Sequence, residues 1–147
     1  RSVELLQALS HEGPAAVREA LTMISQGEPP SAQKGETSLA PKITKQEAVL
    51  NFSNDSETLV NAIRAFTYEP GAWCTWRNES FKITSAVIVE DYPLPPAEIV
   101  VDGQRVIVGC GIKSSIELLT VVPAGKKEMS AADWARGARL QGGESFD

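Results

Sequence analysis

Lys126 and Lys127 are the neighbouring residues whose types and spacing point most directly to chemistry, namely the binding of phosphate groups. They follow an apolar run, residues 116–122, that has the length and composition of a β-strand. Pro123 and Gly125 end that strand, so the sequence predicts a turn that carries both ammonium groups. Paired ammonium groups attract phosphate as point charges, but a solvated turn ahead of a helix has the same pattern. The pair alone leaves both interpretations open.

A short helix is predicted directly after the basic turn. Ser130 is a favourable N-cap residue, and Asp133 stands at the third helical position, where it imitates the acidic member of a capping box. Trp134, with Ala131 and Ala135 around it, is expected to pack this helix onto the rest of the fold.

The remaining elements predict a mainly β fold with helices (α+β), arranged as a small barrel. A capping box at residues 44–47 indicates one helical turn, and Asp55 is expected to start a helix that ends near Phe66. Pro41 makes residues 38–43 a candidate edge segment. Strands are expected at residues 72–77, 80–89, 98–101, 104–109 and 115–122, with tight hairpin turns at Asn78-Glu79 and Asp102-Gly103.

The sequence before the barrel divides into an appendage and a linker. Residues 1–27 are predicted to form two helical pieces, 2–9 and 14–25, with Pro14 in the first turn of the second piece. Residues 28–36 contain prolines, a glycine and small polar residues, which are typical of a linker. The barrel is expected to occupy residues 37–147.

Several motifs in order resemble one family, the methionyl-tRNA formyltransferases. The basic turn, Pro-Ala-Gly-Lys-Lys-Glu-Met-Ser-Ala from residue 123, resembles their C-terminal signature. The other matching segments are Leu-Ala-Pro-Lys-Ile at 39–43 with Lys45 and Glu47, Ile-Arg-Ala-Phe at 63–66, Pro-Gly-Ala-Trp at 70–73 and, more weakly, Phe-Lys-Ile at 81–83 with Ala86. The resemblance runs from about Gly35 to Gly137, and more loosely back to Ser2.

This resemblance implies an open OB-like β-barrel that binds tRNA, preceded by a linker and the last helices of a catalytic domain. The start at Arg1-Ser2-Val3-Glu4 agrees with a segment of a longer protein. The whole enzyme would transfer a formyl group from 10-formyltetrahydrofolate to methionyl initiator tRNA, for translation initiation in the cytoplasm. The expected partners are that tRNA and the upstream catalytic domain of the same chain. No cofactor bound by this segment and no membrane are expected.

No residue of the segment is expected to be catalytic. Related formyltransferases use an Asn, His and Asp constellation in the upstream domain, whereas His11, the single histidine here, has no such motif around it. Lys127 stands where a phosphate-binding P-loop needs Ser or Thr, so nucleotide hydrolysis is not indicated. Cys74 and Cys110 lack metal-type spacing and are predicted to be buried thiols, with a disulfide as the alternative.

The residues that could grip RNA are cations, since contacts to phosphate position a folded RNA without reading its sequence. The candidates are Lys42, Lys45, Arg64, Lys82, Lys126, Lys127 and Arg136. Each one alone is equally well explained as a solvated surface charge, and Arg64 could instead pair with Glu57 or Asp55. Trp73 and Trp76 are three apart in a predicted strand, so one should face the core and the other could stack on bases.

Composition limits these interpretations. With 14 Lys and Arg against 19 Asp and Glu, the formal net charge is -5, so a nucleic-acid module must segregate its cations onto one face. No apolar run approaches the roughly 20 residues that a membrane helix needs. A rival hypothesis is that the barrel is a structural or dimerisation element of a formyltransferase that acts on a sugar nucleotide or purine precursor. A third hypothesis is a free-standing barrel that binds single-stranded nucleic acid. The linker and the truncated helices before the barrel weaken it.

Overall fold

The computed structural model describes all 147 residues of the chain, apart from the side chain of Ile112. The chain divides into two compact units, Ser2–Lys42 and Ile43–Asp147, and Arg1 groups with the second. Among the described residues, no helix is long and apolar enough to cross a membrane.

The first unit contains the helix α1 (Ser2–Ser25), followed by residues 26–42 without helix or strand. The prediction of two helical pieces with His11 in a break was wrong, because Pro14 and His11 both lie inside one continuous helix. A proline removes only one backbone hydrogen bond, and the leucine, alanine and glutamate residues on both sides favour helix. Large apolar side chains of this helix are exposed, namely Leu5, Leu6, Leu9, Val17, Leu21, Met23 and Ile24.

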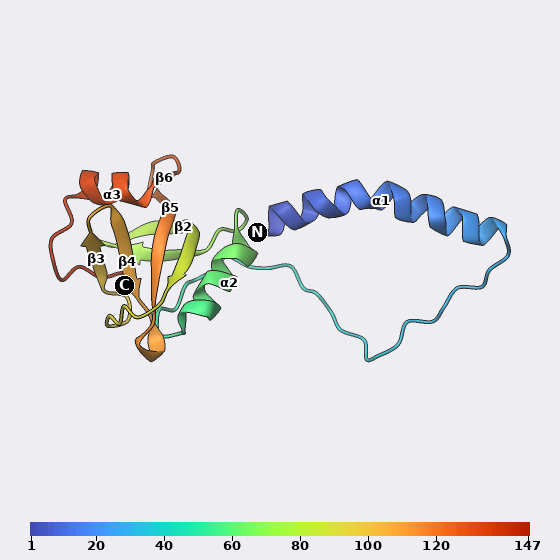
Figure 1. The fold of residues 1–147 in the computed structure, drawn as a ribbon, viewed down its shortest axis with the longest axis horizontal. Helices are drawn as coiled ribbons and strands as arrows, with labels where there is room; N and C mark the ends of the chain where they lie inside the picture. Colours follow the sequence, from blue (N-terminus) through green and yellow to red (C-terminus); the bar gives the residue numbers. More distant parts are fainter. The chain divides into compact units, whose positions relative to one another are not determined.

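The second unit is an antiparallel sheet of six strands with two α-helices packed against it (Figure 1). The strands are β1 (Trp73–Trp76), β2 (Glu79–Val89), β3 (Ile99–Asp102), β4 (Arg105–Gly109), β5 (Ser115–Pro123) and β6 (Met129–Ser130). The helices are α2 (Ser56–Phe66) and α3 (Ala131–Ala138), with a short 3-10 helix, η1 (Gly111–Lys113). The order along the sheet is β1-β2-β5-β4-β3, and β6 pairs with β5. The strand ladder does not close, which confirms the predicted α+β open barrel.

Helix α2 forms where the sequence predicts it. The Asp55 carboxylate accepts a hydrogen bond from the Thr58 backbone N–H at 2.7 Å and so caps the helix N-terminus. Leu59 and Ile63 recur at helical spacing and are fully buried where α2 packs against β2. Just before the helix, the predicted capping box at residues 44–47 is present, with hydrogen bonds between Thr44 and Glu47 in both directions.

Both predicted hairpins are present, but each turn is shifted by one residue. Trp76 pairs with Glu79, so the first turn consists of Arg77 and Asn78, which both have positive φ, as a type I′ turn requires. Asp102 pairs with Arg105, so the second turn is Gly103-Gln104, with Gly103 at positive φ. The turn position depends on the strand register, which Asn and Gly alone do not determine.

The outer edge of β1 is bordered by residues 48–50, and not by the segment that was predicted to lie at a sheet edge. In the described chain, residues 38–43 form no strand, and the predicted edge segment is therefore wrong. Instead the Trp73 N–H donates to the Ala48 carbonyl at 3.0 Å, and the Leu50 N–H donates to the Trp73 carbonyl at 2.8 Å. The buried Ala48 and Leu50 anchor this segment, whereas Pro41 and its neighbours are exposed.

The C-terminal tail, residues 140–147, bridges the gap between the two edge strands of the sheet. On one side the Ile99 N–H of β3 donates to the Glu144 carbonyl at 2.8 Å. On the other side the Asp147 N–H donates to the Thr75 carbonyl of β1 at 3.0 Å. Between these bonds, Phe146 enters the core and is 3% exposed. The tail therefore completes the barrel, a role that the sequence did not predict.

An aromatic cluster fills the core beneath the tail. The Phe146 ring centroid lies 5.1 Å from that of Phe81 and 5.3 Å from that of Phe52. Trp134 of α3 lies 4.6 Å from Phe81 between ring centroids, and Trp76 of β1 lies 5.2 Å from Trp134. Trp134 thus packs α3 onto the barrel as predicted, and at 4% exposure it cannot stack on a base.

Glu144 of the tail should make the stability of the barrel depend on pH. Burial raises the pKa of Glu144, but hydrogen bonds from Arg77, Gln141 and Trp76 and the charge of Arg77 outweigh burial, so the pKa is lowered overall. The carboxylate therefore stabilises the fold above an unfolded pKa of about 4.3, and this contribution is lost as the pH falls through the folded pKa.

Urea denaturation of the wild-type protein and Glu144→Gln at several pH values tests this prediction. The free energy of unfolding of the variant should lie furthest below the wild-type value near neutral pH and approach it as the pH falls below about 4.3. A difference that is the same at every pH would contradict the prediction.

Candidate nucleic-acid interface

The turn between β5 and β6 holds Lys126 and Lys127 in solvent. β5 ends at Pro123, whose carbonyl accepts a hydrogen bond from the Lys126 backbone N–H at 3.0 Å, and Gly125 adopts the positive φ of 67° that the turn requires. Both lysine side chains are exposed, and neither forms an ion pair with any residue that the structure describes. The turn therefore presents two uncompensated positive charges.

Lys45 and Lys82 lie beside Trp73 on the outer side of the β1–β2 hairpin. The Lys45 ammonium lies 5.0 Å from the centroid of the Trp73 ring, and the Trp73 indole N–H donates to the Lys45 carbonyl at 2.8 Å. Lys82 is directly opposite Trp73 in the ladder, so the two side chains share one face. Trp73 is thus the outward-facing member of the tryptophan pair, whereas Trp76 faces the core aromatics.

Lys82 is more constrained than a surface lysine. Its ammonium donates to the Pro70 carbonyl at 3.1 Å, and its side chain is half-buried against Gly71. Gly71 has a φ of 87°, which disfavours a side chain there, and a Cβ at this position would also displace the end of the Lys82 side chain, which lies 2.9 Å away. In the ladder Lys82 is paired with Val122, which places it next to the strand end that leads into the basic turn.

The other candidates are placed less favourably for a common surface. Arg64 is exposed on the last turn of α2 and forms no ion pair with Asp55, Glu57 or any other described residue. Arg136 is exposed but forms an ion pair with Asp133 at 2.7 Å, a pairing that the (i, i+3) spacing could have predicted. Lys42 is exposed at the end of the first unit.

Arg77 is a cation that the sequence did not single out. Its guanidinium lies over Trp76, 4.2 Å from the ring centroid, and forms an ion pair with Glu144 at 2.7 Å. It occupies the β1–β2 turn and lines the same cleft as Lys126. The signal that could have identified Arg77 in the sequence was its place in the hairpin turn, but that turn was predicted one residue later, at Asn78-Glu79.

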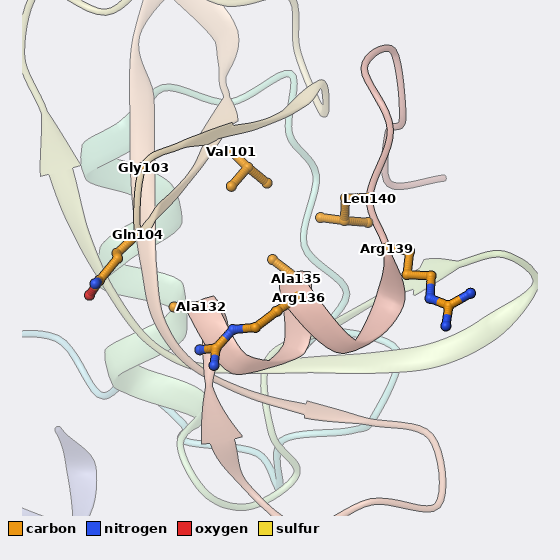
Figure 2. Close-up of a pocket in the computed structure, with 8 residues that line it drawn as sticks. All are labelled: Val101, Gly103, Gln104, Ala132, Ala135, Arg136, Arg139 and Leu140. Atoms are coloured by element: carbon orange, nitrogen blue, oxygen red, sulfur yellow. The ribbon is translucent and has the colours of Figure 1, made fainter.

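A small hollow of about 280 Å³ separates α3 from the β3–β4 turn. Figure 2 shows Val101, Ala135 and Leu140 pointing toward one another across it, whereas Gln104 and Arg139 point away. The three side chains that meet across the hollow are therefore apolar.

Neither of the two cysteines has the character of a reactive nucleophile. Burial raises the pKa of Cys74 well above its ordinary value and that of Cys110 to about 12, so neither forms a thiolate at neutral pH. Both are free and buried, as predicted. No group of three potential metal ligands is found in the part of the chain that the structure describes, and His11 is exposed on α1.

Comparison with known proteins finds relatives for almost the whole chain. The profile of a family described as "Formyl transferase, C-terminal domain" matches residues 42–139. A methionyl-tRNA formyltransferase of Renibacterium salmoninarum is 38% identical over 144 residues, which cover 97% of this chain and 47% of that protein. One of Paenarthrobacter aurescens is 40% identical over 136 residues, which cover 91% of this chain and 44% of that protein. The chain spans about half the length of the curated relatives it matches.

Solved structures of HypX from Aquifex aeolicus have a similar fold. One variant superposes with a TM-score of 0.67 at 16% sequence identity and covers 88% of this chain and 24% of that chain. A second structure, in complex with tetrahydrofolic acid, gives 0.63 at 17% identity, with coverage of 81% and 22%. Because the sequence identities are this low, the structural similarity shows that the fold is shared and nothing more.

Proposed function

The chain belongs to the family of formyl transferase C-terminal domains, and on this premise we propose that it is the tRNA-binding C-terminal part of a methionyl-tRNA formyltransferase. The observation that carries the proposal is that relatives of this name are 36–40% identical over 91–99% of the chain. The parent enzyme then transfers a formyl group from 10-formyltetrahydrofolate to methionyl initiator tRNA in the cytoplasm, for translation initiation.

In this proposal the chain has three parts with different tasks. Residues 1–27 are the helical end of the catalytic domain, residues 28–36 are the linker, and residues 37–147 are the tRNA-binding barrel. The exposed apolar side chains of α1 support this division, since an apolar helix face is normally stabilised by packing against another element. The upstream catalytic domain is the proposed partner of that face.

The barrel contributes phosphate contacts that hold the tRNA while its acceptor end reaches the catalytic domain. Lys126 and Lys127 supply uncompensated ammonium groups, and Lys45 and Lys82 add two more beside Trp73. Arg64, Arg136 and Lys42 are secondary candidates. A protein of net charge -5 needs cations such as these on one face to bind RNA. Positioning of a reactant can account for about 7–11 kcal/mol of a barrier in favourable cases.

The chain alone should not catalyse formyl transfer. The reaction needs a base for the attacking amine and donors for the developing oxyanion, and we expect the upstream catalytic domain to provide both. Incubation of the chain with methionyl-tRNA and 10-formyltetrahydrofolate should give no more formylmethionine than an enzyme-free control. The full-length enzyme, assayed in parallel, should give formylmethionyl-tRNA. Turnover by the chain alone, or none by the full-length enzyme, would contradict the proposal.

A second candidate is that the barrel is a structural or dimerisation element of a formyltransferase for a sugar nucleotide or purine precursor. The acidic net charge of -5 favours it. The same assay distinguishes the two, because the full-length enzyme would then formylate the small amine and leave methionyl-tRNA unmodified.

A further inference from the structure

A cleft of about 480 Å³ opens between three elements. They are the β1–β2 turn, which carries Arg77, the turn after β5, which carries Lys126, and helix α3. The β1–β2 hairpin contributes Trp76 and Arg77, the turn after β5 contributes Lys126, β6 contributes Met129, and α3 contributes Trp134 and Gly137. Ligand pockets for small organic groups typically span about 300–1,000 Å³. The cleft combines an aromatic and apolar floor with a cation on each of two walls.

Arg77 forms a planar platform on one wall. Its guanidinium lies 4.2 Å from the Trp76 ring centroid and is fixed from the side by the Glu144 carboxylate at 2.7 Å. Glu144 also accepts a hydrogen bond from the Trp76 indole N–H at 3.2 Å, so one tail residue holds both members of the stack. The Arg77 side chain is nevertheless 54% exposed. Its orientation is therefore fixed while one side remains accessible to a flat ligand.

Cations and carboxylates both line the cleft, so they match a ligand that carries an anionic group together with hydrogen-bond donors. Lys126 on the second wall forms no ion pair with any described residue. Trp134, whose ring lines the cleft, carries a buried indole N–H without an acceptor among the described atoms. Of the two carboxylates that line the cleft, Asp133 is held by Ser130 and Arg136, which leaves Glu79 to accept from a base amino group.

We infer that this cleft holds one unpaired nucleotide of the bound RNA, with its base against the Arg77 guanidinium and Met129 and its phosphate at Lys126. Guanidinium planes and aromatic rings are the surfaces on which proteins stack unpaired RNA bases. Lys126, which forms no ion pair with a described residue, offers a charge complementary to the nucleotide phosphate. The inference rests on the proposed tRNA-binding function and adds a base-binding site to the phosphate contacts of the same turn.

Filling the cleft tests this inference in the full-length enzyme. A Cβ on Gly137 would meet nothing within 4 Å, so Gly137→Phe can project its ring into the cleft without a backbone clash. Gly142→Phe is the matched control, because a Cβ there also meets nothing within 4 Å and the residue lies outside the cleft. Gly137→Phe should weaken tRNA binding by about 5- to 100-fold, the effect of losing one stacked base, while Gly142→Phe should not.

Two further measurements make the outcome decisive. Arg77→Lys keeps the charge but removes the planar group, so it should also weaken tRNA binding even if Gly137→Phe fails to fold. Ultraviolet cross-linking of bound tRNA should leave a nucleotide on Trp76 or Met129. If the wild-type enzyme binds tRNA but Arg77→Lys and a folded Gly137→Phe bind it equally well, the inference is wrong and the proposed function stands. If the wild-type enzyme does not bind tRNA, both fail.

Discussion

Replacement of Phe146 by alanine is expected to destabilise the barrel by about 3–5 kcal/mol, the usual effect of deleting a buried aromatic side chain. Phe146 is 3% exposed and contacts the rings of Phe52, Phe81 and Trp134. Its loss leaves a cavity in the aromatic cluster and removes the anchor that holds the tail across the sheet edges. Since small domains are stable by only about 5–15 kcal/mol, a large fraction of the variant should be unfolded at modest urea concentrations.

The matched control for Phe146→Ala is Ser145→Ala. Ser145 is the preceding tail residue, its side chain is exposed, and its pairing with Glu98 is a backbone bridge that alanine retains. Urea denaturation followed by tryptophan fluorescence should show a clear shift of the midpoint for Phe146→Ala and almost none for the control. A loss below about 1 kcal/mol would mean that the tail does not close the barrel.

Simultaneous replacement of Lys126 and Lys127 by alanine is expected to weaken tRNA binding by about tenfold or more at 0.1 M salt. Each phosphate contact that is lost should reduce the slope of log affinity against log salt by about 0.7–0.9. The reduction should be similar for different tRNA sequences, because phosphate contacts carry no base information. Stability should hardly change, because exposed charges contribute little to folding.

Lys34→Ala serves as the control for charge alone, since Lys34 is an exposed lysine in the segment before the barrel. Binding of tRNA by the full-length enzyme, measured at several salt concentrations, should distinguish the two variants. If the double variant keeps both affinity and slope, the turn is merely solvated, and the small-molecule formyltransferase becomes the better explanation.

Local signals allowed much of the fold to be predicted from the sequence. The caps at Asp55 and Ser130 depend on residues within one helical turn, and both helices begin where those caps predict. The hairpins were also predictable, but their turns depend on which side chains face the core. That is a property of the whole ladder, so each predicted turn was displaced by one residue.

The features that could not be predicted depend on partners distant in sequence. The tail has only two large apolar side chains, Leu140 and Phe146, and its pairing becomes visible only when β1 and β3 are placed on either side of it. The candidate interface also combines features that local sequence predicts with features that depend on distant partners. Exposure of Lys126 followed from Pro123 and Gly125, whereas the tie between Lys82 and Pro70 and the position of Arg77 over Trp76 required the hairpin register.

The central claim, that this chain binds tRNA through a basic face, is tested most directly by titrating the unmodified 147-residue chain with tRNA at several salt concentrations. The log affinity should fall linearly with log salt, with a slope of about -1.4 or steeper, equivalent to two or more phosphate contacts. Absence of binding at about 50 mM salt, where such contacts are strong, or an affinity that does not change with salt, would contradict the claim.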